Sequence, residues 1–450
     1  MLGPSVVCSK PLPIGEIVLE SALTLDIVSG PAIIVLYTLS AVIAAYLLLR
    51  RPTRRWVITV LIAFAVGGTC AVAIWFFGIR VFHLVDIPLS RIVYAWLAAT
   101  LVGVCLAIVN LWRSRWWRKV IASIGIVAFL TTGTVAVNAW FGLDRSLGAF
   151  LGVTVSKPIA LAPLSAPTAH SKPVGPLWKT WIPPADIPAK GTIGTVTIPG
   201  TISGFTARPA GLYLPPAALV ADPPPLPLVV MMMGQPGDPD PSYTAGVLDA
   251  LAAQHHGLAP IVIVADQLGN PNTDTLCLDT PQLGNIETYI TQDVVNWAIA
   301  NLNVTKDHRY WTVAGYSNGG ECALSFLIKH QKLWSNVLDI SGEEIPGADD
   351  PAEVLATIFN GDQAAYDAVK PLNILSSTKL PGTFGVFTVG SNDSAFVPGQ
   401  RQVAAATKAA GMISTYYEVP NGGHVLPALT DGLQHAYQLL YVRLGLAPPS

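Results

Sequence analysis

Charged side chains are scarce in this sequence. Asp, Glu, Lys and Arg make up only 12% of its 450 residues, against roughly a quarter in an average soluble domain. Hydrophobic residues reach 51%, and the mean hydropathy is +0.49. A wholly soluble chain is therefore excluded, and part of it must lie in lipid. The formal net charge is only −2, so nucleic acid is not expected as a partner.

Two kinds of motif are also missing. The sequence has no G-x-G-x-x-G and no G-x-x-x-x-G-K-[ST] phosphate loop, so no nucleotide cofactor is expected. No spacing typical of metal ligands stands out. His255 and His256 are adjacent, and neighbours in sequence usually point in different directions. We therefore expect neither a cofactor nor a metal ion.

Long hydrophobic runs are concentrated near the N-terminus. Each of four runs holds roughly 20 residues, enough to cross a hydrocarbon core of about 30 Å. They lie at 31–49, 56–78, 92–112 and 120–140. The runs lack the acidic or basic residues that would mark an ion or proton path, so we interpret them as an anchor.

The loops between these runs differ in charge. The first loop contains Arg50, Arg51, Arg54 and Arg55, and the third contains Arg113, Arg115, Arg118 and Lys119. The positive-inside rule places both loops in the cytoplasm, which puts both termini and everything after about residue 141 outside. The alternative, a cleaved signal peptide with buried core helices, explains only one short apolar run. The pattern predicts a multi-pass protein of the cell membrane.

The composition changes after the last run. We expect a membrane region at 1–144, a Pro- and Ala-rich linker at 145–190 that acts as a semi-rigid spacer, and a globular domain at 191–450. Strand and helix patterns alternate in that domain. This alternation predicts an α/β fold with a mostly parallel sheet and helices on both faces.

The segment 315–319 reads Gly-Tyr-Ser-Asn-Gly and matches G-x-S-x-G. It follows a hydrophobic strand and precedes a helix, which is the setting of a nucleophilic serine in α/β-hydrolases. Ser317 is therefore the candidate nucleophile. The alternative is an ordinary serine at a helix start after a glycine turn.

A serine nucleophile needs a histidine base and an acid that holds it, in the chain order Ser, acid, His. His424 lies in a loop directly after a strand, whereas His330 and His435 fall in predicted helices. Asp393 ends another strand and is the candidate acid. Its competitors follow the preceding strand and are Asp339, Glu343 and Glu344.

The proposed chemistry also requires donors for an oxyanion. We expect one to be the backbone N–H of Asn318, directly after the nucleophile. The other should come from the turn that follows the strand at 225–234. Gln235 is the best candidate there, because Pro236 has no N–H.

Five cysteines are present, and only Cys277 and Cys322 belong to the domain predicted outside the cytoplasm. Cys70 and Cys105 fall in the apolar runs, and Cys8 precedes them. In an oxidising compartment Cys277 and Cys322 could form a disulfide. Two buried free thiols are the alternative.

Residues 195–445 resemble the esterase D family, which includes the mycolyltransferases of mycolate-containing envelopes. The resemblance rests on GLYLPP, VVMMMGQPGD, ETYITQDVVNWA, VAGYSNGGECAL and GGH. It implies a serine nucleophile, acid and histidine at Ser317, Asp393 and His424. Some members also carry cysteines that match Cys277 and Cys322, which supports the disulfide.

These observations predict a membrane-anchored serine esterase acting on carboxylic esters through an acyl-enzyme. Its substrate would lie in the cell envelope, where we consider lipids, acylated glycans and aminoacylated phospholipids. An acyltransferase resembling the mycolyltransferases, using the same three residues, is the nearest alternative. The alternative from another class is a catalytically inactive envelope scaffold or sensor.

Overall fold

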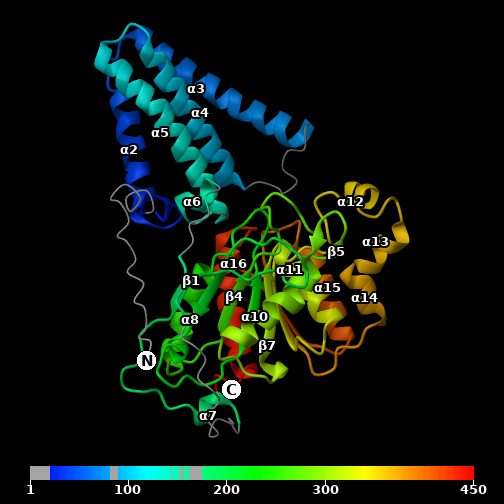
Figure 1. Ribbon diagram of the computed structural model, residues 1–450. Helices are drawn as coiled ribbons and strands as arrows, with labels where there is room; N and C mark the ends of the chain where they lie inside the picture. Colours follow the sequence, from blue (N-terminus) through cyan, green and yellow to red (C-terminus); the bar gives the residue numbers. More distant parts are fainter. Residues whose placement is uncertain are drawn as a thin grey trace, which may run out of the picture. The chain divides into compact units, whose positions relative to one another are not determined.

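A computed structural model describes residues 21–81, 90–142, 144–151, 153, 157–161 and 175–449. The chain divides into two compact units, Met1–Val155 (unit 1) and Ser156–Ser450 (unit 2). Figure 1 shows the helices of unit 1 in blue and cyan and the sheet of unit 2 in green to red. Cys8 and the stretch 162–174, where the sequence predicts part of the linker, lie outside the described residues.

The described part of unit 1 contains four helices that are long and apolar enough to cross a membrane. They are α2 (Pro31–Leu48), α3 (Arg54–Trp75), α4 (Arg91–Leu111) and α5 (Trp116–Phe141), and α3 continues as the π-helical turn η1 (Phe76–Val81). A short helix, α6 (Leu147–Phe150), follows. The four predicted runs are confirmed as helices, which fits a multi-pass membrane protein.

Small residues bring the helices of unit 1 close together. A Cβ on Gly67 of α3 would lie 2.6 Å from the Cα of Val102 of α4, and one on Gly133 of α5 would lie 2.0 Å from Thr100 Oγ1 of α4. Without a hydrophobic driving force between helices in lipid, such close approach is what allows them to associate. The α4 helix therefore packs against both α3 and α5.

The two Arg-rich loops of unit 1 meet at one end of the bundle. Arg50 Nη2 donates to the carbonyl oxygen of Arg113 at 3.1 Å. Arg118 Nη2 donates to the carbonyl oxygens of Tyr46 and Leu47, both at 2.8 Å. These carbonyls belong to the last turn of α2, where helix carbonyls lack intrahelical partners. The basic side chains of the two loops thus gather at a single end of the helix bundle.

Unit 2 is built on an eight-stranded sheet in the order β1-β2-β4-β3-β7-β8-β9-β10. The strands are β1 (Thr192–Val196), β2 (Ala210–Leu214), β3 (Leu228–Met232), β4 (Ile261–Ala265), β7 (Trp311–Tyr316), β8 (Asn336–Ile340), β9 (Phe384–Gly390) and β10 (Ile413–Val419). Only β2 runs antiparallel to its neighbours; the other pairs are parallel. With the separate β5–β6 pair left out, the order is that of the α/β-hydrolase fold, and the predicted fold class is confirmed.

Helices lie on both faces of this sheet (Figure 1). One group packs α8 (Ser242–Gln254) against α16 (Leu426–Arg443). In the other, α14 (Pro371–Ser377) contacts both α11 (Asn318–Lys329) and α15 (Val397–Ala409). The helical segment from Ile286 to Asn301 is built from α9 (Ile286–Thr288), a π-helical turn η3 (Tyr289–Asp293) and α10 (Val294–Asn301).

Several short elements complete unit 2. They are α7 (Leu177–Thr180), η2 (Pro216–Ala218), the hairpin β5 (Asp279–Thr280) and β6 (Gly284–Asn285), η4 (His308–Tyr310), α12 (Pro351–Thr357) and α13 (Gln363–Val369). Part of the stretch predicted as linker belongs to unit 2 and contacts its sheet and loops. Pro158 pairs with Thr195 of β1, and Trp181 Nε1 donates to the carbonyl oxygen of His256 at 2.9 Å.

The core of unit 2 positions the functional loops. Every residue of β3, β4, β7 and β8 is buried, as expected for strands covered on both faces. Because β3, β4, β7, β8, β9 and β10 run parallel, the loops after them all emerge at one edge of the sheet. This edge is where ligands bind in open α/β sheets.

Candidate active site

Ser317 occupies a sharp turn between β7 and α11. Its backbone has φ 55° and ψ −122°, a conformation rare for a residue with a side chain. The turn is fixed by a hydrogen bond from Ser317 N–H to the carbonyl oxygen of Ile340, at 2.9 Å. Gly320 N–H in turn donates to the Ser317 carbonyl at 2.8 Å. The predicted strand–turn–helix setting is therefore present.

The two glycines of the motif are required by close backbone approach. A Cβ on Gly315 would lie 1.8 Å from the Gly319 carbonyl oxygen, and one on Gly319 would lie 2.4 Å from the carbonyl oxygen of Met232 on β3. No side chain fits in either place. The sequence pattern G-x-S-x-G thus follows from the tightness of this turn.

His424 and Asp393 meet Ser317 from the loops after β10 and β9. His424 Nε2 lies 2.8 Å from Ser317 Oγ, and His424 Nδ1 lies 2.8 Å from Asp393 Oδ2. A carboxylate can only accept, so Nδ1 carries the ring proton and the Nε2 lone pair faces the serine hydroxyl. The structure brings the three predicted residues together in the order that a nucleophile, a base and an orienting acid require.

The imidazole of His424 stacks on two aromatic rings. Its centroid lies 4.0 Å from that of Phe396 and 5.3 Å from that of Tyr316, with interplanar angles of 24° and 21°. The Asp393 side chain is only 2% exposed, and that of His424 9%. These stacking contacts and the bond to Asp393 orient the ring toward Ser317.

The competing acids have other partners. Asp339 Oδ1 accepts from Gly342 N–H at 3.0 Å and from Gln400 Nε2 at 2.8 Å. Burial raises the pKa of Asp339 to about 7. The carboxyl of Glu344 is exposed. For Glu343, burial is the main reason that the pKa is raised well above its usual range.

The competing histidines also lie in other surroundings. His330 Nε2 is 2.7 Å from Glu287 Oε1. His435 stacks on Tyr417 with a centroid distance of 3.9 Å. Neither contacts Ser317, in agreement with the choice of His424 made from the sequence.

The predicted oxyanion donors flank the serine. Asn318 is the first residue of α11, and the N–H groups of a first helical turn have no intrahelical partner. The loop after β3 passes against the nucleophile, since a Cβ on Gly234 would lie 3.1 Å from Ser317 Cβ. Gln235 follows in that loop. Its N–H and that of Asn318 remain the predicted donors.

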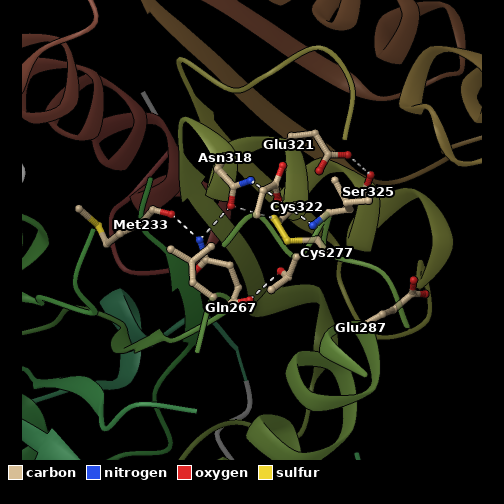
Figure 2. The surroundings of a disulfide bond; sticks show 12 residues. Met233, Gln267, Cys277, Glu287, Asn318, Glu321, Cys322 and Ser325 are labelled. Atoms are coloured by element: carbon tan, nitrogen blue, oxygen red, sulfur yellow. Dashed lines mark hydrogen bonds between the residues drawn. A yellow bond between two sulfur atoms is a disulfide. The ribbon is translucent and has the colours of Figure 1, made fainter. Parts of the chain in front are cut away.

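Cys277 and Cys322 form a disulfide with a Cα–Cα distance of 5.4 Å. It ties the loop after β4 to α11 one turn beyond the nucleophile (Figure 2). Glu321 lies beside it and accepts a hydrogen bond from Ser325 Oγ at 2.6 Å. The two sulfurs and the Glu321 carboxyl are close enough to suggest a metal site, but sulfurs joined in a disulfide cannot serve as thiolate ligands.

Sequence reasoning missed the polar side chains of the loop after β4. Gln267 and Asp274 both contact the Asn318 side chain, at 3.2 and 3.0 Å. One signal could have found them: polar residues directly after a fully buried strand lie at the functional edge of a parallel sheet. The same loop, from Leu268 to Thr275, lines a shallow hollow of about 400 Å³ together with Phe205.

The fold and this constellation define the class of the chain: an α/β-hydrolase-fold protein with the serine, histidine and aspartate arrangement of the serine hydrolases. No protein-family model matches it. The chain belongs to the same family as an uncharacterized protein of Corynebacterium glutamicum, Cgl0967/cg1104. The two are 31% identical over 350 residues, covering 75% of this chain and 79% of that protein. Because these 350 residues exceed the length of unit 2, the similarity includes part of unit 1.

Several solved structures are similar to part of the chain. A ferulic acid esterase is 17% identical with a TM-score of 0.48, covering 57% of this chain and 99% of its own. An S-formylglutathione hydrolase from Agrobacterium tumefaciens is 17% identical with a TM-score of 0.46, covering 57% and 97%. The fluorophosphonate-binding serine hydrolase FphF of Staphylococcus aureus is 15% identical with a TM-score of 0.44, covering 56% and 98%.

Proposed function

We propose that the chain is a membrane-anchored serine esterase that hydrolyses carboxylic esters through an acyl-enzyme on Ser317. The observation that carries this proposal is the pair of 2.8 Å contacts that link Ser317 Oγ, His424 and Asp393 on a strained strand-to-helix turn. Such a constellation is the recognised geometry of an activated serine. A scaffold would not need it.

In the first half-reaction Ser317 Oγ attacks the ester carbonyl while its proton moves to His424 Nε2. Asp393 keeps the ring oriented and stabilises the imidazolium. The negative charge on the carbonyl oxygen is met by the N–H groups of Gln235 and Asn318, each contributing about 3–4 kcal/mol. His424 then returns its proton to the departing alcohol, which leaves Ser317 acylated.

In the second half-reaction His424 takes a proton from a water molecule, whose oxygen attacks the acyl carbon. The carboxylic acid is released and the proton returns to Ser317 Oγ. If an alcohol enters instead of water, the same acyl-enzyme yields a new ester. This step alone separates a hydrolase from an acyltransferase resembling the mycolyltransferases.

We place unit 2 on the extracytoplasmic side of the cell membrane, after a membrane region and a linker. Two observations support this side. The basic side chains of unit 1 gather at one end of the bundle, which the positive-inside rule assigns to the cytoplasm. The Cys277–Cys322 disulfide fits an oxidising compartment. The substrate would then be an ester of the envelope: a lipid, an acylated glycan or an aminoacylated phospholipid.

The proposal is tested by stopped-flow hydrolysis of a p-nitrophenyl ester by the full-length chain in detergent. We expect a burst of p-nitrophenol equivalent to one acyl group per chain, followed by slower turnover. The burst should disappear in His424→Ala. Adding an alcohol such as glycerol or trehalose and measuring the ester product then distinguishes hydrolysis from transfer. A well-folded chain that releases no p-nitrophenol above the uncatalysed rate contradicts the proposal.

A further inference from the structure

Two consecutive side chains at the end of β4 reach both ends of the loop that carries the proposed oxyanion donor Gln235. Asp266 is fully buried and Gln267 is 2% exposed. In the described residues, neither side chain forms a hydrogen bond with the reacting groups Ser317, His424 or Asp393. Both instead contact residues at the two ends of the 233–238 loop, Gln267 directly and Asp266 through Arg208.

Gln267 holds the first end of the loop and the residue after the nucleophile. Its Nε2 donates to the Met233 carbonyl oxygen at 2.6 Å and to Asn318 Oδ1 at 3.2 Å (Figure 2). An amide nitrogen has two hydrogens, so both bonds form at once. The Gln267 carbonyl oxygen of the backbone accepts from Thr275 Oγ1 at 2.8 Å. One side chain therefore links the two segments from which both proposed oxyanion donors come.

The Asn318 amide is fixed from its other side as well. Its Nδ2 donates to Asp274 Oδ1 at 3.0 Å, and the same oxygen accepts from Leu276 N–H at 2.7 Å. With Oδ1 facing the Gln267 amide and Nδ2 facing Asp274, the side chain has only one orientation that satisfies both partners. These two bonds anchor the first turn of α11, in which the backbone N–H of Asn318 is the second proposed donor.

Asp266 holds the far end of the loop through Arg208. Arg208 Nη2 donates to Asp266 Oδ1 and to the Gly237 carbonyl oxygen, both at 2.8 Å, and Nη1 donates to Asp238 Oδ1 at 2.7 Å. Asp266 Oδ2 also accepts from the Arg208 backbone N–H at 2.6 Å. The Arg208 side chain is only 15% exposed. Its planar fork therefore joins the loop to the sheet at three points.

We propose that Asp266 and Gln267 are positioning residues: by fixing both ends of the 233–238 loop and the Asn318 side chain, they hold the oxyanion donors in place relative to Ser317. This inference rests on the proposed esterase function. Its physical basis is that preorganised donors act only if they are held within about 0.5 Å of their productive position, which is roughly 3 Å from the oxygen that they stabilise. Loosening the supports of these donors should reduce the stabilisation of the transition state. The binding of the substrate in its ground state should stay nearly unchanged.

The test compares Gln267→Met with Asn336→Leu in the full-length chain. Methionine keeps the volume of Gln267 and removes both donors. Asn336 is an equally buried amide whose Nδ2 donates to two carbonyl oxygens, but at the opposite end of β8 from the site. We expect Gln267→Met to lower kcat by about 10- to 100-fold, less than the roughly 10²- to 10³-fold of a lost donor, with KM nearly constant. Asn336→Leu should lose stability without this loss of kcat.

A second readout separates positioning from general loosening. A trifluoromethyl ketone forms a tetrahedral adduct with an active serine and places its oxygen where the oxyanion develops, so its affinity should fall by the same factor as kcat/KM in Gln267→Met. In a double-mutant cycle with Asn318→Ala, the two losses should be less than additive because both act through one contact. Arg208→Lys keeps the positive charge but removes the planar guanidinium that binds both Asp266 and the loop. It should show the same pattern, and it replaces Gln267→Met as the test variant if that chain does not fold.

The outcomes are distinguishable. An active wild-type chain whose kcat and inhibitor affinity are the same in Gln267→Met and Arg208→Lys overturns the positioning role and leaves the esterase proposal intact. Equal losses of kcat in Gln267→Met and Asn336→Leu also overturn it, since they would reflect stability alone. A folded wild-type chain without esterase activity overturns both proposals.

Discussion

Ser317 has a strained backbone conformation that its neighbours hold in place. Its positive φ is stabilised by hydrogen bonds with the backbone groups of Ile340 and Gly320, and its Oγ lies 2.8 Å from the His424 ring nitrogen Nε2. Such strain persists only where the surrounding structure over-determines it. Here Gly315 and Gly319 provide the space in which β7, α11 and β3 come together.

The glycine requirement predicts a large asymmetry between two Gly→Ala substitutions. Gly315→Ala would place a Cβ 1.8 Å from a backbone oxygen, so we expect a loss of more than about 3 kcal/mol in the free energy of unfolding. Gly246→Ala is the matched control: it lies within α8 and a Cβ there meets nothing within 4 Å. Helix propensity should then stabilise the chain by up to about 1 kcal/mol. Equal thermal midpoints for the two variants would contradict this account of the turn.

At the scale of elements, the segments that follow β4, β7 and β8 bring the carboxyls of Asp274, Glu321 and Glu343 together near the disulfide. Burial is the main reason that the pKa of Glu321 rises to about 8, and it also raises the pKa of Asp274. Glu321 belongs to the first turn of α11, four residues after Ser317. Its neutral form is thus part of the folded state near neutral pH, and its ionisation opposes folding.

This burial predicts a pH dependence of stability. The folded state keeps a proton on Glu321 that the unfolded chain releases, so stability is fully present below about pH 4.5 and is lost as pH rises toward 8. Glu321→Gln keeps the acceptor for Ser325 and removes the ionisation. At pH 8.5 we expect this variant to be more stable than wild type by at least about 1 kcal/mol, since one pKa unit corresponds to about 1.4 kcal/mol. At pH 4.5 the difference should vanish.

Thermal unfolding of the two proteins at pH 4.5, 6.5 and 8.5 measures this effect. Glu344→Gln is the control, because the carboxyl that it removes belongs to an exposed residue. It should leave the pH dependence of the thermal midpoint unchanged. A Glu321→Gln chain with the same pH dependence as wild type would refute the assignment.

The regular elements of this chain were predictable because their patterns are local. The buried strands β3 and β7 and the long helix α16 carry continuous or periodic apolar residues, and the four runs of unit 1 are unmistakable by length. The helices α12, α13 and α14 have only seven residues each, too few for a periodic signal. They form between β8 and β9 because tertiary contacts stabilise them, and a pattern search does not detect such contacts.

The candidate site was also predictable only in part. The motif around Ser317 and the loop positions of Asp393 and His424 follow from strand ends and chain order. The contacts of Gln267 with Met233 and Asn318 join residues 34 and 51 positions apart. Nothing in the local sequence specifies which carbonyl a buried amide will meet, so these supports could be seen only in three dimensions.

For the whole molecule, the two units imply different environments. The described helices of unit 1 expose apolar side chains, among them Ile34, Leu61 and Val127, each more than half exposed. Exposed apolar side chains on long helices suit a hydrocarbon surrounding. Unit 2 contains a disulfide and a buried core of the kind found in soluble enzymes. The proposed placement of unit 2 outside the cytoplasm is consistent with both observations.

This placement predicts the behaviour of reporter fusions. Alkaline phosphatase folds only where its disulfides can form, so we expect activity when it is fused after Ser450. When it is fused after Arg115, between α4 and α5, it should be inactive, because the proposed orientation puts that loop in the cytoplasm. Thiol labelling of the denatured full-length chain from cells should also find Cys277 and Cys322 blocked. The opposite pattern of reporter activity would invert the membrane orientation.

The central claim is that Ser317 is an activated nucleophile, and labelling with a fluorophosphonate tests it most directly. The full-length chain, Ser317→Ala and the buried-serine control Ser325→Ala are each treated with the probe, and the modified peptide is identified by mass spectrometry. We expect one adduct, on Ser317, in wild type and in Ser325→Ala, and none in Ser317→Ala. A folded wild-type chain that stays unlabelled, or an adduct that persists in Ser317→Ala, would contradict the account.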